Sequence, residues 1–155
     1  MKPIKGERGQ SLVELGISLL ILVYLLAGLV EFGVLFFQYI QLRDAAQEGA
    51  LYGSTRPFDV LAIVDRVKYS SDSPLDLPVL VASGDVTVSI NIDGISSTDL
   101  ANYAIVDCEG HGIQVVVGYD HQIFMPFMAA LLGSPTIPLS ASVTDTILTP
   151  LQCTP

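Results

Sequence analysis

The hydrophobic pattern divides the chain into one continuous apolar segment and a body with shorter, regular patterns. Residues 15–40 contain a single charged side chain, Glu31, and residues 15–30 contain none. A helix built from this segment is apolar on every face, as a lipid environment requires. About 20 such residues are enough to cross a bilayer. The pattern therefore predicts a transmembrane helix over residues 15–40.

Alanine and polar residues extend the predicted helix beyond the apolar segment. Ala45, Ala46 and Ala50 favour helix, and we expect Gly53 and Pro57 to end it. A helix over residues 10–52 is about 65 Å long, which exceeds the thickness of a bilayer. The side chains that we expect to face water along its second half are Gln38, Gln41, Arg43, Asp44, Gln47 and Glu48.

The remaining residues alternate between helical and strand patterns. Apolar positions at helical spacing predict short helices over residues 58–68 and 124–132. Strict alternation predicts strands over residues 86–92, 113–119 and 139–148, and Asp93-Gly94 predicts a hairpin turn after the first of them. We therefore expect an α+β fold in which a small antiparallel sheet packs against the polar half of the long helix.

The charges separate a basic N-terminus from an acidic body. Lys2, Lys5 and Arg8 precede the apolar segment with only Glu7 among them, whereas residues 69–155 contain nine acidic residues and no Lys or Arg. By the positive-inside rule, the N-terminus stays in the cytoplasm and the body lies outside it. The net charge of −9 excludes nucleic acid as an expected partner, because phosphate binding requires a basic surface.

Glu14 stands at the edge of the apolar segment, where a carboxylate is costly. The cost is about 2.5–3.5 kcal/mol at the centre of a membrane, so a simple anchor has no use for this residue. A basic leader that ends at Gly9, with Glu14 five residues later, resembles the processing site of the type IV pilin superfamily. The resemblance implies that a prepilin peptidase cuts between Gly9 and Gln10. It also implies that Glu14 pairs with the new amino group of Gln10 on a neighbouring subunit.

Three strings together resemble the TadE-like family of the tight-adherence (Tad) pilus. They are Arg-Gly-Gln-Ser-Leu-Val-Glu at residues 8–14, Val-Glu-Phe-Gly at residues 30–33 and Ala-Ala-Gln-Glu-Gly-Ala-Leu-Tyr-Gly at residues 45–53. Residues 115–119 and 137–142 resemble the closing strand pair of the same family. The second string makes Glu31 another candidate assembly residue.

The resemblance implies a pilin-like plan: a leader at residues 1–9, a long helix at residues 10–54 and an extracytoplasmic α+β body at residues 55–155. It implies a structural pilin or pseudopilin subunit without enzymatic activity or cofactor. Such a subunit packs in the bilayer with other copies or other pilins, and membrane assembly machinery builds them into an adhesive surface filament. The alternative is a monomeric single-pass anchor that keeps its leader and displays an acidic binding domain outside the cell.

Cys108 and Cys153 are the only cysteines, and both lie in the predicted extracytoplasmic body. Disulfides form in such oxidising compartments, so we expect one disulfide between them; two free thiols are the alternative. A metal site built from these cysteines and His111 lacks a fourth ligand at a plausible spacing. We therefore expect no metal centre.

The histidines and the acidic turns give little indication of further chemistry. We expect His111 and His121 on the flanks of strands or in loops, and no Gly-x-Ser-x-Gly motif supports a hydrolase. Asp93, Asp107 and Glu109 offer oxygen ligands for Ca²⁺, but they lack the spacing of an EF-hand. Solvated turn carboxylates are the favoured interpretation.

Overall fold

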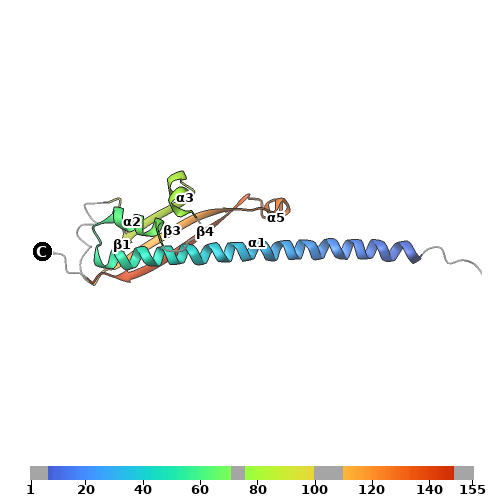
Figure 1. The fold of residues 1–155 in the computed structure, drawn as a ribbon, viewed down its shortest axis with the longest axis horizontal. Helices are drawn as coiled ribbons and strands as arrows, with labels where there is room; N and C mark the ends of the chain where they lie inside the picture. Colours follow the sequence, from blue (N-terminus) through green and yellow to red (C-terminus); the bar gives the residue numbers. More distant parts are fainter. Residues whose placement is uncertain (1–6, 71–75, 100–109, 149–155) are drawn as a thin grey trace, which may run out of the picture.

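The longest element is a single uninterrupted helix, α1, which runs from Glu7 to Thr55 and contains 49 residues. The structure, a computed structural model, describes residues 7–70, 76–99 and 110–148. Figure 1 shows that α1 projects well beyond the rest of the molecule on its N-terminal side, while its C-terminal half lies along the body. The expected α+β fold class, with a long N-terminal helix and a small antiparallel sheet, is confirmed.

The described part of the body contains short helices around one four-stranded sheet. Its strands follow the order β2-β1-β3-β4, and all neighbouring strands are antiparallel. Its elements are α2 (Val60–Lys68), α3 (Leu77–Ser83), β1 (Val86–Ile92), β2 (Ile95–Ser96), β3 (Gly112–Gln122), α5 (Pro126–Leu132) and β4 (Thr136–Thr146).

The predicted helices and strands are confirmed, and α3 is an additional helix that the hydrophobic pattern did not indicate. Its sequence is apolar on nearly every position, so it has no helical periodicity to detect. Its ends nevertheless carry local signals, because Asp76 caps its N-terminus through a bond from the amide of Val79, and Gly84 ends it in the left-handed conformation.

The predicted turn at Asp93-Gly94 joins β1 to β2. Ile92 pairs directly with Ile95, so the loop contains two residues. Both have positive φ angles, 46° at Asp93 and 85° at Gly94. Two consecutive positive φ angles match the twist of the flanking strands, which explains why an Asp-Gly pair occupies the loop.

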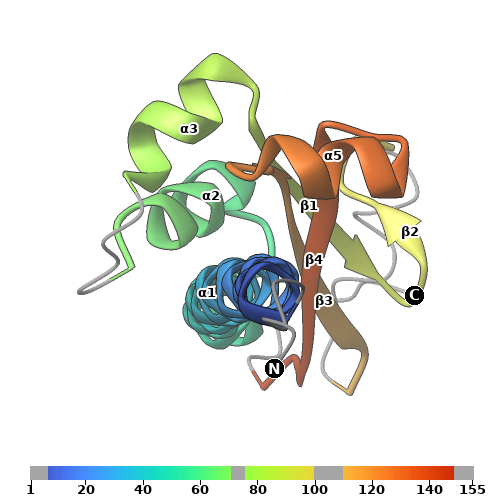
Figure 2. The same cartoon turned by 90° about the vertical axis from the view of Figure 1, so that its right-hand side faces the viewer.

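One face of the sheet is covered by helices. Figure 2 shows α1 and α2 on the same side of β1, β3 and β4. Alternate side chains of each strand point to this face, since successive residues of a strand point to opposite sides. The buried hydrophobic residues are Leu42, Ala45, Ala46, Ala50, Ile63, Val67, Leu77, Val86, Ile90, Ile92, Ile113, Val115, Val117, Ala141 and Ile147.

Helix α1 changes character along its length. All side chains from residue 9 to residue 26 are exposed, whereas residues from Ala27 to Ser54 bury one continuous face against the body. Gln41 is buried and Gln38 is half-buried on this face, so the expectation that both face water is wrong. The sheet covers the side of the helix on which they lie, a fact that helix polarity alone does not show.

Two glycines of α1 allow the helix to lie close to the body. A Cβ atom at Gly49 would lie 2.5 Å from Val67 Cγ2, and a Cβ atom at Gly53 would lie 2.6 Å from Ile113 Cδ1. Gly53 was expected to end the helix, and that expectation is wrong because α1 continues to Thr55. The helix ends immediately before Arg56, whose conformation is restricted by Pro57.

We expect Gly49→Ala to destabilise the body by about 1–3 kcal/mol, because the added methyl group overlaps the short, β-branched side chain of Val67. Gly33→Ala is the matched control, since a Cβ atom there meets nothing within 4 Å. The control should be neutral or should stabilise the helix by up to about 1 kcal/mol. The free energy of unfolding of the full chain in detergent micelles measures both, and equal stability of the two variants would contradict the assigned packing.

Candidate functional site

The predicted processing and assembly residues lie on the projecting end of α1. Gly9, Gln10 and Glu14 are all exposed, and the helix is continuous through the bond between residues 9 and 10. Glu14 forms no hydrogen bond or ion pair with any residue that the structure describes. Its carboxylate is therefore available to a group outside the subunit. The structure contains one copy of the chain, so the roles predicted for these three residues stay predictions.

The projecting end is long and apolar enough to cross a membrane. It belongs to the helix from Gly9 to Thr55, whose most apolar window has a mean hydropathy of 2.5. Residues 9–26 correspond to about 27 Å of helix, close to the thickness of the hydrocarbon core of a bilayer. Glu14 is the only charged residue among them. The apolar side chains of this segment are exposed on all faces, and the ring of Tyr24 contacts Phe127 of the body.

Glu31 differs from the exposed Glu14, because the body encloses it. Glu31 is only 4% exposed. Glu31 Oε1 lies 2.9 Å from His121 Nε2, and it also accepts a hydrogen bond of 3.2 Å from the backbone amide of Phe124. The Phe124 ring packs edge-on against the His121 imidazole, with 5.6 Å between ring centroids. The Glu31–His121 pair thus joins α1 to the end of β3, 90 residues away in the sequence.

His121 is 1% exposed and lies within β3, so its expected place on a strand flank or in a loop is wrong. The sequence contains the signal for its burial. The inward alternation that begins at Ile113 continues through Val117 and Tyr119 to His121, two residues beyond the strand that we predicted. A polar residue on the inner face needs a buried partner. Glu31 on α1 is that partner.

The Glu31–His121 pair fixes the position of the sheet along the axis of α1. A buried carboxylate is costly unless donors compensate for its lost hydration, and Glu31 has two donors, from a side chain and from the backbone. If β3 slid along α1 by one helical turn, both donors would lose their acceptor. The arrangement can therefore set the register between the helix and the body.

The second histidine stabilises the hairpin. His111 Nδ1 contacts Asp93 Oδ2, and Asp93 Oδ1 accepts a hydrogen bond of 3.0 Å from the backbone amide of Gly112. Both hydrogen bonds hold the pKa of the Asp93 carboxyl below its ordinary value, and the bond to His111 has the larger effect. Asp93 therefore has a structural role beside β3. Asp107 and Glu109, the other candidate calcium ligands, lie outside the described residues.

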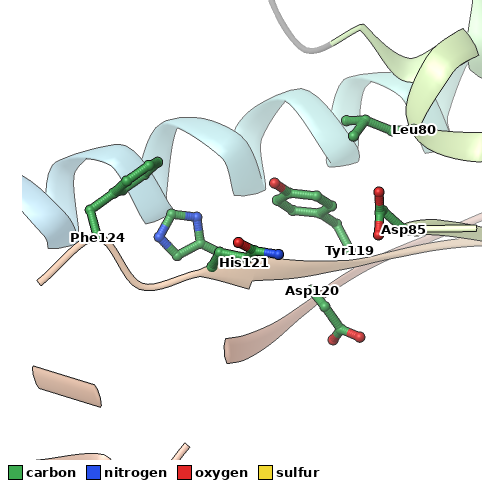
Figure 3. A pocket seen from close by; sticks show the side chains of 7 residues that line it. Leu80, Asp85, Tyr119, Asp120, His121 and Phe124 are labelled. Carbon is green, nitrogen blue, oxygen red and sulfur yellow. The ribbon is translucent and has the colours of Figure 1, made fainter. Parts of the chain in front are cut away.

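A hollow of about 260 Å³ lies where β3 meets α3. Figure 3 shows Tyr119 and His121 on the α1 side of β3, and Asp120 pointing to the other side. Asp85 and Asp120, the acidic residues of its lining, therefore do not point to a common position. No group of three or more His, Cys, Asp or Glu side chains that could hold a metal ion occurs among residues 7–70, 76–99 and 110–148.

The two cysteines are also outside the described residues. Cys108 and Cys153 were expected to form a disulfide in the extracytoplasmic body, and this pairing stays a prediction.

We expect Glu31→Leu and His121→Leu each to destabilise the body, because each leaves a buried polar group without its partner. The cost is about 1–3 kcal/mol for an unsatisfied donor and about 3–5 kcal/mol for an unpaired buried charge. The double variant should be much less destabilised than the sum, since it removes both groups. A double-mutant cycle in detergent micelles, based on the free energy of unfolding, measures this coupling. Strictly additive effects would show that the pair does not hold α1 to β3.

The lowered pKa of Asp93 predicts how the hairpin responds to acid. Its ionised form stabilises the fold above the ordinary pKa of an aspartate, about 4, and this contribution is lost as pH falls through the lower folded-state pKa. Asn tolerates the positive φ angle that the turn requires at position 93, and its side-chain oxygen can still accept a hydrogen bond from Gly112. The stability deficit of Asp93→Asn at neutral pH should therefore shrink on acidification below about pH 4. Unfolding midpoints across pH measure this, with exposed Asp44→Asn as control; a deficit independent of pH would refute it.

Comparison with known proteins places the N-terminal helix in a family. Residues 9–51 match the family of TadE-like proteins. The matched segment begins at Gly9 and includes Glu14 and Glu31, and all three strings that suggested the resemblance overlap it. The match does not reach residues 115–119 and 137–142, so their likeness to a closing strand pair stays a prediction.

No curated protein and no solved structure matches the chain. The family match therefore carries the assignment. The matched residues lie in α1, the helix that exposes apolar side chains on all faces of its projecting end and that contributes Glu31 to the pair with His121. On this evidence the resemblance inferred from the sequence is confirmed over residues 9–51, which match the TadE-like family.

Proposed function

We propose that this protein is a pilin or pseudopilin subunit of a Tad-type pilus, assembled through the projecting end of α1. One observation carries the proposal. Residues 9–26 expose apolar side chains on every face, and the only charge among them is the unpartnered carboxylate of Glu14. Lipid can cover the apolar faces, but it offers no partner for a carboxylate. A neighbouring subunit can cover the apolar faces and also offer an amine that pairs with the carboxylate.

The proposed sequence of events begins in the membrane. The basic residues 1–9 stay in the cytoplasm, a span within the apolar segment 15–40 holds the helix in the bilayer, and residues 55–155 form the extracytoplasmic body. A prepilin peptidase removes residues 1–9 by cutting after Gly9. The helix of residues 10–54 then leaves the bilayer with its body when the assembly machinery adds the subunit to an adhesive filament on the cell surface.

Two features of α1 support packing between subunits. The new α-amine of Gln10 can pair with Glu14 of a neighbour, where the low-dielectric surroundings make an unpaired charge of either sign costly. A Cβ atom added at Gly16, Gly28 or Gly33 would meet nothing within 4 Å in the isolated subunit. Small residues of this kind let neighbouring helices approach closely. The proposed role is structural and needs no cofactor; a Cys108–Cys153 disulfide would stabilise the exported body.

Glu14→Leu should separate a filament subunit from a monomeric anchor. In a filament it leaves the Gln10 amine of a neighbour without a partner, at a cost of about 3–5 kcal/mol per contact. We therefore expect normal insertion and leader removal, but loss of the protein from sheared surface material. In an anchor the same change removes a polar burden and should be neutral or favourable to insertion. Glu14→Gln should be intermediate, because it keeps an acceptor without the charge.

Gly9→Leu is the comparison variant, since it should block the peptidase and leave Met1 on the chain. Intact mass reports the leader, and the protein levels in the membrane and sheared-surface fractions report insertion and assembly. Normal surface assembly of Glu14→Leu, or parent protein that retains Met1 at the surface, would overturn the proposal in favour of the anchor.

A further inference from the structure

The connection between β3 and β4 forms an apolar tip at the end of the body nearest the projecting part of α1. This α5 tip comprises residues 123–135 and includes the helix α5. Figure 1 places it farthest of all body elements toward the N-terminus of α1. Phe124, Phe127 and Leu132 are 74%, 51% and 53% exposed. Such a group of large apolar side chains on one exposed tip marks an interaction surface.

The tip has no charge that would hold it in water. Residues 122–144 contain no Asp, Glu, Lys or Arg, in a body that is otherwise acidic. Two ionisable residues beside the tip, Glu31 and His121, are bonded to each other, and Phe124 packs over His121. Asp120, which lines the same hollow as Phe124, precedes the tip in the sequence and is not part of it.

The height of the tip along α1 identifies what covers it. The Phe127 ring contacts Tyr24, with 4.6 Å between ring centroids, and the amide of Phe124 binds Glu31. The tip therefore flanks α1 from Tyr24 to Glu31, a distance of about 10 Å. About 20 residues cross the hydrocarbon core, so a span that begins between residues 10 and 15 ends between residues 29 and 34. The tip lies at the level of the outermost part of that span.

The backbone of the tip suits contact with lipid, which offers no hydrogen bonds. The amide of Ile123 binds the carbonyl of Pro135, and the amide of Gly133 binds the carbonyl of Ala129. Ser134 Oγ donates to the carbonyl of Thr136 and accepts from the amide of the same residue. The turn therefore satisfies these polar groups internally. Pro126 and Pro135 have no amide hydrogen to satisfy.

We propose that the α5 tip inserts into the extracytoplasmic leaflet beside α1, so that this protein has a second membrane-contacting element. The binding partner is the acyl-chain region of the bilayer, entered by apolar burial. Because the tip is uncharged, insertion needs no anionic headgroups and is insensitive to salt. The inference requires α1 to cross the membrane, but it does not require filament assembly.

The chain contains no Trp, so one introduced tryptophan reports its own surroundings. The test uses the full chain in phosphatidylcholine vesicles whose acyl chains are brominated either near the headgroup or near the chain end. Phe127→Trp keeps an aromatic ring against Tyr24. Leu20→Trp, in the projecting segment, is the reference inside the membrane. Leu61→Trp is the matched reference in water, since Leu61 on α2 is an apolar residue that is 80% exposed.

We expect the emission of Phe127→Trp to be blue-shifted and quenched most by bromine near the headgroup. Leu20→Trp should be quenched most by bromine near the chain end, and Leu61→Trp should not be quenched. Added salt or anionic lipid should leave the quenching of Phe127→Trp unchanged.

Unquenched, red-shifted emission from Phe127→Trp, like that of Leu61→Trp, would overturn the proposal. Blue-shifted emission that is unquenched and depends on protein concentration would also overturn it, because a second copy would then cover the tip. Loss of quenching in Leu20→Trp would remove the span on which the inference depends. Filament formation affects none of these readings, so failure here is distinguishable from failure of the proposed pilus role.

Discussion

The packing of one face of α1 against the inner face of the sheet is the interaction on which the rest of the structure depends. Isolated strand pairs are only marginally stable in water, and this small sheet gains a core because α1 and α2 cover it. Gly49 and Gly53 let the helix approach closely enough for Val67 and Ile113 to fill the space between them. The same helix extends beyond this contact, so the body and the projecting segment form one continuous rod.

Two glutamates on α1 show how this contact divides the helix. Glu14 lies where no body covers the helix and has no described partner, whereas Glu31 lies where the body begins and has two donors. A carboxylate in apolar surroundings must find a donor or a cation. The subunit itself supplies the donors for Glu31, and no described residue bonds to Glu14. The assembly roles expected for Glu14 and Glu31 stay predictions.

The Glu31–His121 pair also determines where the body stands along α1. Because the pair fixes the end of β3 against one turn of α1, the α5 tip has a fixed height beside Tyr24. The tip is uncharged and apolar at the level where the helix itself is apolar. A body that reaches down to this level limits the freely exposed part of the helix to residues 9–26. The length of helix that projects beyond the body is thus set by the place where the body packs.

The sequence by itself determined most of the elements and the TadE-like resemblance of residues 9–51. Period-2 alternation over residues 86–92 and the Asp93-Gly94 turn identified β1 and its hairpin, because a half-buried strand and a tight turn leave local signals. The apolar run identified α1 for the same reason. The α3 helix was missed because a helix that is apolar on nearly every position has no periodicity.

Only the tertiary structure decided which side chains of these elements meet. Gln38 and Gln41 are polar and were expected in water, yet the sheet covers them, and Gly53 provides close packing instead of a helix end. Glu31 and His121 are 90 residues apart, and no local pattern relates two such positions. Their pairing depends on the register of β3 against α1, which is set by the whole core at once. Local sequence patterns specify the elements, and the packed core decides which of their faces are buried and what lies opposite.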